Sequence, residues 1–336
     1  MLINKLLKME NKIQVALIYR PCHTLSQENF YTYIYHYFMN ALRRNEDISV
    51  TNYPTGEIFD INEIKQDTDI IILPENGITG DTCMPREIKN IDKIDIPVLS
   101  HIGDAHSMTK NEIQINHEKY NITAYCGRHP EKLFRKYYGQ KFNFRTILGG
   151  LENPLYENIT EFNNRKKTKI LNSGALAPTK FLSKLVCKYF RKGDRVNQYR
   201  LRTMCNNLPY VDYTTTLEHE YVGDKYHLLL EKYAAAIAAT SYCYTVKYLE
   251  IPASGCLTFM EVTEENYAKN LGFKDNESAI FINEKNYQDR FEEYINDINN
   301  KKWGEIADAG RTHVMNNLTN DHAINALVEF MDELIN

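Results

Sequence analysis

The stretch YTVKYLEIPASGCLTFME, residues 244–261, joins a short amphipathic helix to an apolar run. Lys247 and Glu250 stand three residues apart, so a helix places them on one face. Pro252 cannot continue the backbone hydrogen-bond ladder, and Gly255 permits a sharp exit from the helix. The apolar run that follows is typical of a buried parallel strand. The stretch therefore predicts one helix–turn–strand unit of an α/β fold.

The same alternation runs along the chain on both sides of this stretch. Short β-branched runs alternate with segments of helical periodicity, which predicts parallel sheets with helices on both faces. Further strands are expected at residues 12–19, 67–75, 96–106, 121–127, 144–150, 167–176, 234–240 and 278–283. Further helices are expected at residues 26–44 with Ser26 as N-cap, 130–139, 179–190, 225–233, 265–273, 287–298 and 322–335.

A polar segment without periodicity, residues 151–167, separates two such series. We expect an N-terminal Rossmann-like domain at 1–155, a second at 165–320, and a closing helix at 321–336. The predicted fold class is α/β, with two doubly wound domains facing each other across a cleft. Ligands of such domains bind where the carboxyl ends of the strands meet the helices.

The composition excludes several classes of protein. Lysine and arginine number 40 against 44 acidic residues, a net charge of −4, so no strong nucleic-acid footprint is present. Seven cysteines without a CxxC pair favour reduced thiols and a cytoplasmic protein. No apolar run reaches the roughly 18 residues of a membrane helix. Peripheral contact with a membrane stays open.

The polar residues of the opening stretch suggest a nucleotide site. Thr245 is expected to cap the helix, so that free N–H groups and the Lys247 ammonium attract an anion. Glu250, one turn on, has two oxygens for a pair of vicinal hydroxyls. An anion site and a diol acceptor one turn apart describe a diphosphate and its ribose. The alternative is a solvated ion pair between Lys247 and Glu250, worth tenths of a kcal/mol.

The sequence VKYLEIPASGCLTF, residues 246–259, resembles the nucleotide-sugar signature of GT-B glycosyltransferases, especially bacterial and archaeal family 1 or spore-protein-like members. KILNSGALAPTKFLSKL, residues 169–185, is similar to the first strand, glycine loop and helix of their C-terminal domain, and residues 304–327 resemble their closing segment. The resemblance implies that Glu250 binds the donor ribose. It further implies that the diphosphate meets Ser173, Gly174, Lys184 in place of an arginine, Tyr244, Thr245 and Lys247.

The resemblance implies the transfer of a sugar from a nucleoside diphosphate sugar to an acceptor hydroxyl, with no required cofactor or metal. Many retaining relatives carry a glutamate eight residues before the ribose glutamate, where this chain has Tyr242. The stereochemistry therefore stays open, as do the base, the sugar, the acceptor and the oligomeric state. The alternatives are a nucleotide-sugar 2-epimerase and a non-catalytic nucleotide- or glycan-binding module of the same architecture.

In the first half, SHIGDAHSM, residues 100–108, follows a predicted strand. Asp104 and His106 are candidates for the general base that deprotonates the acceptor. The alternative is a Gly-Asp turn with a structural histidine, and a weaker one is a metal site that includes His101. Further candidates on the acceptor side follow the first two buried strands and are Arg20, His23, Glu75 and Asn76.

Overall fold

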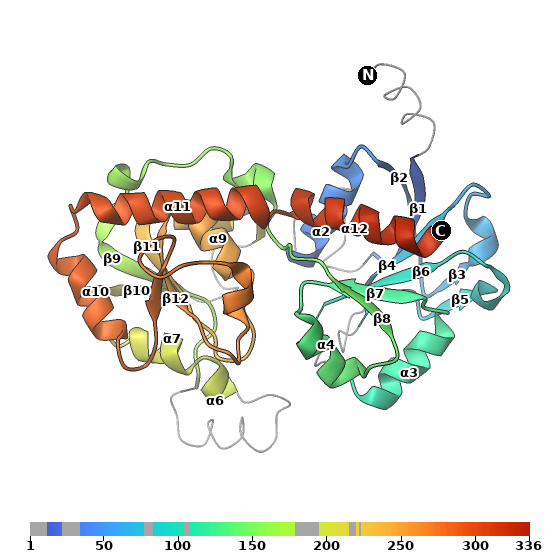
Figure 1. Ribbon diagram of the computed structural model, residues 1–336, viewed down its shortest axis with the longest axis horizontal. Helices are drawn as coiled ribbons and strands as arrows, with labels where there is room; N and C mark the ends of the chain where they lie inside the picture. The colour runs from blue at the N-terminus through green and yellow to red at the C-terminus, as the bar shows by residue number, and fades with distance from the viewer. Residues whose placement is uncertain are drawn as a thin grey trace. The chain divides into compact units, whose positions relative to one another are not determined.

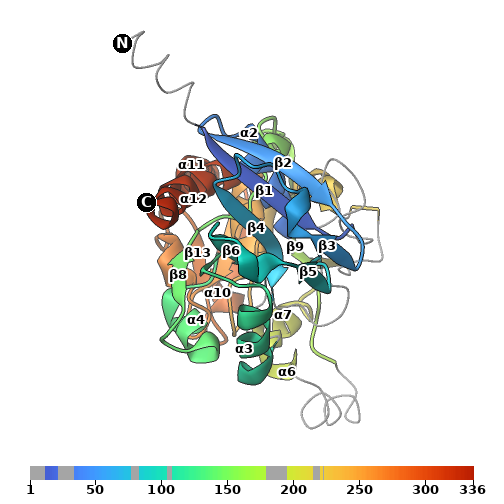
Figure 2. The same cartoon turned by 90° about the vertical axis from the view of Figure 1, so that its right-hand side faces the viewer.

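The structure is a computed structural model that describes residues 12–21, 34–76, 83–103, 108–178, 195–214, 220–221 and 223–336. The chain divides into two compact units. Figures 1 and 2 show its ribbon from two directions at right angles. Unit 1 comprises the chain up to Glu152 together with Thr319–Asn336, and unit 2 comprises Asn153–Leu318. Each unit contains a parallel sheet with helices packed against it, so the predicted α/β class is confirmed.

Unit 1 is built on a six-stranded sheet in the order β2-β1-β4-β6-β7-β8, in which every pairing is parallel. A small parallel pair, β3-β5, accompanies it. The strands are β1 (Ile13–Tyr19), β2 (Ile48–Pro54), β3 (Ile58–Asp60), β4 (Ile70–Asn76), β5 (Glu87–Lys89), β6 (Val98–Ile102), β7 (Ala124–Gly127) and β8 (Asn143–Thr146). The helices are α2 (Ile34–Arg44), α3 (Lys110–Lys119), α4 (Glu131–Tyr138) and α12 (Asn320–Ile335).

Alternate residues of β1 face two separate apolar cores. Val15 and Leu17 pack with α2 and α12, whereas Ala16 and Ile18 pack with residues of α3 and α4. A parallel strand covered on both faces has no polar side to present, which is why KIQVALIY reads as a continuous apolar run. Helix α12 lies beside α2 on the same face (Figure 1).

Unit 2 contains a five-stranded parallel sheet in the order β10-β9-β11-β12-β13. Its strands are β9 (Lys166–Ser173), β10 (Val211–Thr214), β11 (Tyr233–Ala238), β12 (Leu257–Glu261) and β13 (Ile280–Ile282). Its helices are α6 (Arg195–Gln198), α7 (Arg200–Cys205), α8 (Tyr226–Leu230), α9 (Lys247–Ala253), α10 (Tyr287–Asn296) and α11 (Lys301–Asn317). Short 3-10 turns, Asn153–Tyr156 and Phe162–Asn164, occupy the segment predicted to be a linker.

The structure corrects the predicted helix at 265–273, which is only a 3-10 turn, Ala268–Leu271. The backbone of Tyr267 is left-handed, with φ +57°. The Asn266 side chain donates to the carbonyls of Thr240 and Glu261, so it ties the segment to the sheet. These tertiary bonds outweigh the weak helical periodicity of the segment.

Other element predictions differ in their bounds. Strands β2 and β10 were not predicted, since polar residues interrupt their apolar pattern. The helix predicted at 26–44 is described from Ile34 onward, and its expected cap, Ser26, lies outside the described residues, as does the helix predicted at 179–190. Pro252 lies inside α9, and Gly255 with φ +77° follows the helix end, so the glycine ends this helix.

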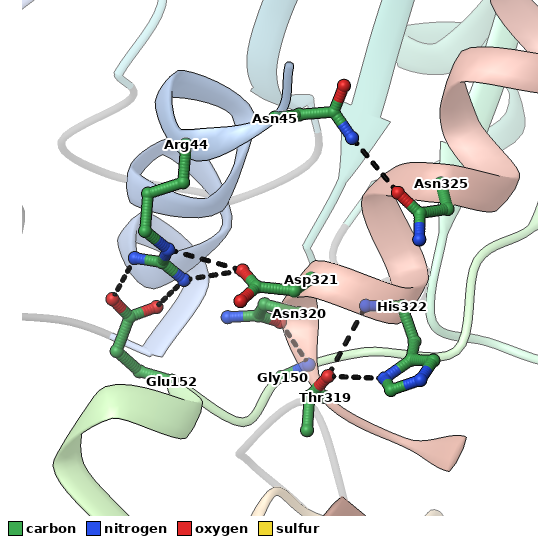
Figure 3. Close-up of polar contacts among 9 residues, drawn as sticks. All are labelled: Arg44, Asn45, Gly150, Glu152, Thr319, Asn320, Asp321, His322 and Asn325. Carbon is green, nitrogen blue, oxygen red and sulfur yellow. Dashed lines mark hydrogen bonds and ion pairs between the residues drawn. The ribbon is translucent and has the colours of Figure 1, made fainter. Parts of the chain in front are cut away.

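The chain leaves and re-enters unit 1 through two hydrogen-bonded segments. Leu151 and Thr319 form an isolated parallel bridge, and the Asn320 N–H donates to the Leu151 carbonyl at 2.9 Å. The Gly150 N–H in turn donates to Asn320 Oδ1 at 2.6 Å. Thr319 caps α12 through its side chain, which accepts from the His322 N–H (Figure 3). The start of α12 is thereby fixed to the last residues of the first segment.

Arg44, at the end of α2, bonds to both segments at once. Its Nη1 lies 2.5 Å from Glu152 Oε1, and its Nη2 lies 2.7 Å from Asp321 Oδ1 (Figure 3). The Glu152 side chain is only 5% exposed, and burial raises its pKa although Arg44 acts in the opposite direction. A buried carboxylate of this kind depends on its cationic partner.

We expect Arg44→Ala to lower the free energy of unfolding by about 2–3 kcal/mol, because it leaves Glu152 buried without its cation. Urea unfolding is the measurement. Adding Glu152→Gln to Arg44→Ala should recover part of the loss, since the unpaired charge is then gone.

The matched control is Arg86→Ala, which removes an ion pair to Glu57 whose side chains are 79% and 51% exposed. An exposed pair contributes about 1 kcal/mol or less. Equal losses for Arg44→Ala and Arg86→Ala contradict the role assigned to Arg44.

Candidate functional site

The carboxyl ends of three strands of unit 2 lie at one edge of its sheet. The register pairs Ala236 with Leu171 and Ala238 with Met260, so β9, β11 and β12 end at nearly the same level. Ser173 is the last residue of β9 and Glu261 the last of β12. This is the edge at which doubly wound sheets bind ligands.

Two cationic side chains converge at this edge over Gly174. Lys247 Nζ, from the first residue of α9, donates to the Ser173 carbonyl at 2.6 Å and lies 3.2 Å from Ser173 Oγ. Arg202, from α7, is 3% exposed and donates through Nη1 to the Ala175 carbonyl at 3.2 Å. A Cβ built on Gly174 would lie 2.5 Å from Lys247 Nζ and 3.0 Å from Arg202 Nη1.

Gly174 is required here for two reasons. Its φ is +111°, a backbone conformation that residues with a Cβ rarely adopt. Its missing side chain also leaves room for the two cations. The glycine turn predicted from the sequence therefore lies directly against the two cationic side chains.

Burial and the nearby Arg202 lower the pKa of Lys247 to about 7, and Glu250 opposes this shift. Although Lys247 as a residue is partly exposed, its ammonium lies against Ser173 and over the Tyr226 ring, 5.3 Å from the ring centroid. Two like charges without a bound anion disfavour each other. An anionic ligand between them would restore the proton on Lys247.

Glu250 is 7% exposed and lies close enough to Lys247 and Tyr226 to influence the pKa of each. The Tyr226 hydroxyl and Ser173 Oγ form a hydrogen bond of 2.5 Å. The lysine and glutamate predicted to share a helix face thus belong to one buried polar cluster with Ser173 and Tyr226. They are not the solvated surface pair that was the alternative.

The expected cap of α9 is wrong. The N-cap is Val246, in a helical conformation and without a side-chain cap bond. The Thr245 Oγ1 atom is buried and has no hydrogen-bond partner among the described residues. Tyr244 is 3% exposed and packs near Tyr248, with ring centroids 6.4 Å apart. The helix has only seven residues, so the positive charge of this site comes from side chains.

Several predicted site residues cannot be placed. Asp104, His106, His23 and Lys184 lie outside the described residues, as do the side chains of Glu75 and Asn76 at the end of β4. Arg20, after β1, forms an ion pair with Glu57.

His101 at the end of β6 stacks on Phe38, with ring centroids 4.5 Å apart. Within the described ranges, no three His, Cys, Asp or Glu side chains gather as a metal site. Among the helices of those ranges, none has the length and hydropathy to cross a bilayer.

Arg202 is the residue that sequence reasoning missed. It lies in the segment RLRTMC, which carries no motif, and only the packing of α7 brings its guanidinium to Gly174 and to the Ala239 carbonyl, 2.8 Å away. The sequence-based interpretation assigned the second cation to Lys184. No local pattern distinguishes Arg202 from a surface arginine.

Comparison with solved structures identifies the architecture. A glycosyltransferase from Rickettsia africae matches with a TM-score of 0.57 at 10% identity, covering 97% of this chain and 99% of its own. An alpha-glucosyltransferase in complex with UDP-glucose and abasic-site DNA matches with a TM-score of 0.58 at 8% identity, covering 96% and 100%. The chain has the GT-B fold.

A third similar structure is HepE of Anabaena in complex with UDP and glucose, with a TM-score of 0.53 at 10% identity, covering 96% of this chain and 100% of its own. No protein-family model matches the chain, and no curated protein matches it by sequence. The predicted GT-B fold class is confirmed by structure alone.

The depressed pKa of Lys247 makes stability depend on pH. The unfolded chain holds this proton up to about pH 10.4, whereas the folded chain releases it near pH 7. The unfolded state then binds more protons, so stability should rise as the pH rises from about 7 to 10. Lys247→Met should remove this part of the rise in urea unfolding at pH 7, 8.5 and 10. If the free energy of unfolding rises equally with pH in the variant and the wild type, the lowered pKa of Lys247 is contradicted.

Gly174→Ala should destabilise the protein more than Gly139→Ala. Both positions have positive φ, but a Cβ on Gly139 meets nothing within 4 Å, so that variant has only the backbone cost of about 1–3 kcal/mol. At Gly174 the methyl group must also displace Lys247 and Arg202. Thermal unfolding of the two variants provides the comparison. Equal losses of stability would contradict the contact expected between the new methyl group and the two cationic side chains.

Proposed function

We propose that this protein is a glycosyltransferase that moves a sugar from a nucleoside diphosphate sugar to an acceptor hydroxyl. The observation that carries the proposal is the convergence of Lys247 and Arg202 over Gly174, at the ligand-binding edge of a GT-B chain. Two cations beside a glycine turn match the charge of a diphosphate.

The chemical role of this pair follows from where charge develops. When the bond between the anomeric carbon and the diphosphate breaks, negative charge grows on the leaving group. Positioned cations stabilise that charge more in the transition state than in the ground state. Arg202 is held by bonds to the Ala175 and Ala239 carbonyls, so it requires little rearrangement to act. We include Lys184 and the N–H groups near Ser173 in the same role.

The roles of the other candidate residues are proposed from the sequence analysis. Glu250 is proposed to accept the ribose hydroxyls. Asp104 or His106, which follow β6, would take the proton of the acceptor hydroxyl if the reaction inverts configuration. The acceptor would meet unit 1 near Arg20, His23, Glu75 and Asn76.

The donor we favour is a UDP-hexose, since the alpha-glucosyltransferase and HepE structures contain UDP-glucose or UDP with glucose. No cofactor or metal is part of the proposed mechanism. The acceptor class stays open, because one of these relatives is bound to DNA. We propose a cytoplasmic location from the reduced-thiol pattern of the sequence.

The test is calorimetric titration of UDP, GDP, CDP and ADP into the wild type, Lys247→Met and Glu250→Gln. One nucleotide should bind, and Lys247→Met should weaken it about 10-fold or more, since a charge-assisted hydrogen bond contributes about 1.5–3 kcal/mol. Binding at pH 8 should take up a proton in the wild type, because the diphosphate raises the pKa of Lys247.

The control is Lys269→Met, whose side chain is 77% exposed, and it should bind like the wild type. Absence of binding for all four nucleotides contradicts the proposal. Turnover of the donor without an acceptor contradicts group transfer and favours the epimerase alternative.

A further inference from the structure

A second charged group, Glu261, stands at the same edge without a role in the proposed mechanism. It ends β12 and is separated from β9 only by β11. At about 4.8 Å between neighbouring strands, roughly 10 Å separates it from the backbone of Ser173. A single nucleotide sugar can span that distance.

The side chain of Glu261 faces α7. Residues two apart in a strand share a face, and both Leu257 and Phe259 pack in one core with Leu201 of α7. Arg202 is the next residue of that helix and is close enough to lower the pKa of Glu261. Glu261 and Arg202 therefore approach each other from the sheet and from the helix.

Each of these two side chains has one buried atom without a hydrogen bond. Glu261 is 5% exposed. Among the residues that the structure describes, its Oε2 has no partner, and its Oε1 has only a long contact of 3.5 Å from Ser241 Oγ. The two Nη atoms of Arg202 donate to carbonyls, but its buried Nε has no partner in the described part of the chain. Buried polar atoms are almost always paired, so an unpaired acceptor and an unpaired donor together need an explanation.

A hydroxyl group has the chemistry to pair with either kind of atom, since it donates to a carboxylate oxygen and accepts from an N–H. We infer that Glu261 is a further ligand-binding residue of the donor site, which accepts a hydrogen bond from a hydroxyl group of the bound nucleoside diphosphate sugar. The inference rests on the proposed function.

The protonation state of Glu261 fits this role. Burial and the neighbouring Glu284 raise its pKa to about 7. The ionised form is therefore accessible near neutral pH, and a hydroxyl donated to it would stabilise that form. Glu261 in the absence of ligand is instead a buried carboxylate that costs stability.

The test compares Glu261→Gln with the wild type in titrations of pyrophosphate, UDP, 2′-deoxy-UDP and UDP-glucose. Glu261→Gln should bind UDP-glucose about 10-fold or more weakly, because a hydrogen bond to a charged group is lost, and should bind pyrophosphate within about twofold of the wild type. If the ribose supplies the hydroxyl, UDP binding also weakens in the variant. If that hydroxyl is the 2′-hydroxyl, the preference for UDP over 2′-deoxy-UDP is also smaller in the variant than in the wild type, and Glu250 retains its share of it. If the transferred sugar supplies it, only UDP-glucose binding weakens.

The matched control is Glu231→Gln, in the same unit but before the amino end of β11, where its carboxylate accepts from Thr160 at 3.0 Å. It should bind all four probes as the wild type does. A second measurement is the thermal unfolding of ligand-free Glu261→Gln, which should be at least as stable as the wild type because it loses a buried unpaired charge.

Two results overturn the inference. One is undiminished binding of UDP-glucose by Glu261→Gln, and the other is an equal loss for pyrophosphate, which would mean that Glu261 acts only through the position of Arg202. In both cases, binding of UDP-glucose by the wild type still supports the proposed function. Wild-type protein that binds none of the probes overturns the proposed function and this inference with it.

Discussion

The bonds of Arg44 to Glu152 and Asp321 join three segments of unit 1 that lie far apart in the sequence. The chain departs from unit 1 at Glu152 and returns at Thr319, and one guanidinium bonds to both segments. The return matters because α12 supplies Ile324, Leu327 and other core residues on one face of the sheet. Without that helix, α2 alone would cover this face, and part of the parallel sheet would be open to water.

In unit 2 several buried polar groups are arranged in a way that lowers stability. Around Gly174, Lys247 and Arg202 are brought together although like charges repel, and Glu261 is buried with one oxygen that has no partner within the described ranges. A chain selected only for stability would avoid each of these features. Functional sites commonly retain such costs because a ligand offsets them when it binds. The concentration of unsatisfied charge at one sheet edge is therefore the strongest physical sign of a site in this unit.

The opening stretch shows where local reasoning succeeded and where it failed. The spacing of Lys247 and Glu250 and the glycine at 255 correctly indicated a helix, a sharp exit and a buried strand. The cap was wrong, because Thr245 turns its hydroxyl into the interior, and no motif signals that choice. The helix predicted at 265–273 failed for a similar reason, since Asn266 bonds to strands distant in sequence.

The sequence alone determined the α/β class and the parallel strands, and it placed Lys247 and Glu250 on one face of a short helix that ends before a glycine. Periodicity and glycine positions are properties of neighbouring residues, so a single chain displays them. The roles of three other residues follow only from the tertiary structure. They are Arg202, Glu261 and Arg44. The significance of each lies in a partner that is far away in sequence, and burial sets the pKa of Lys247 and Glu261 only after the helices have packed against the sheet.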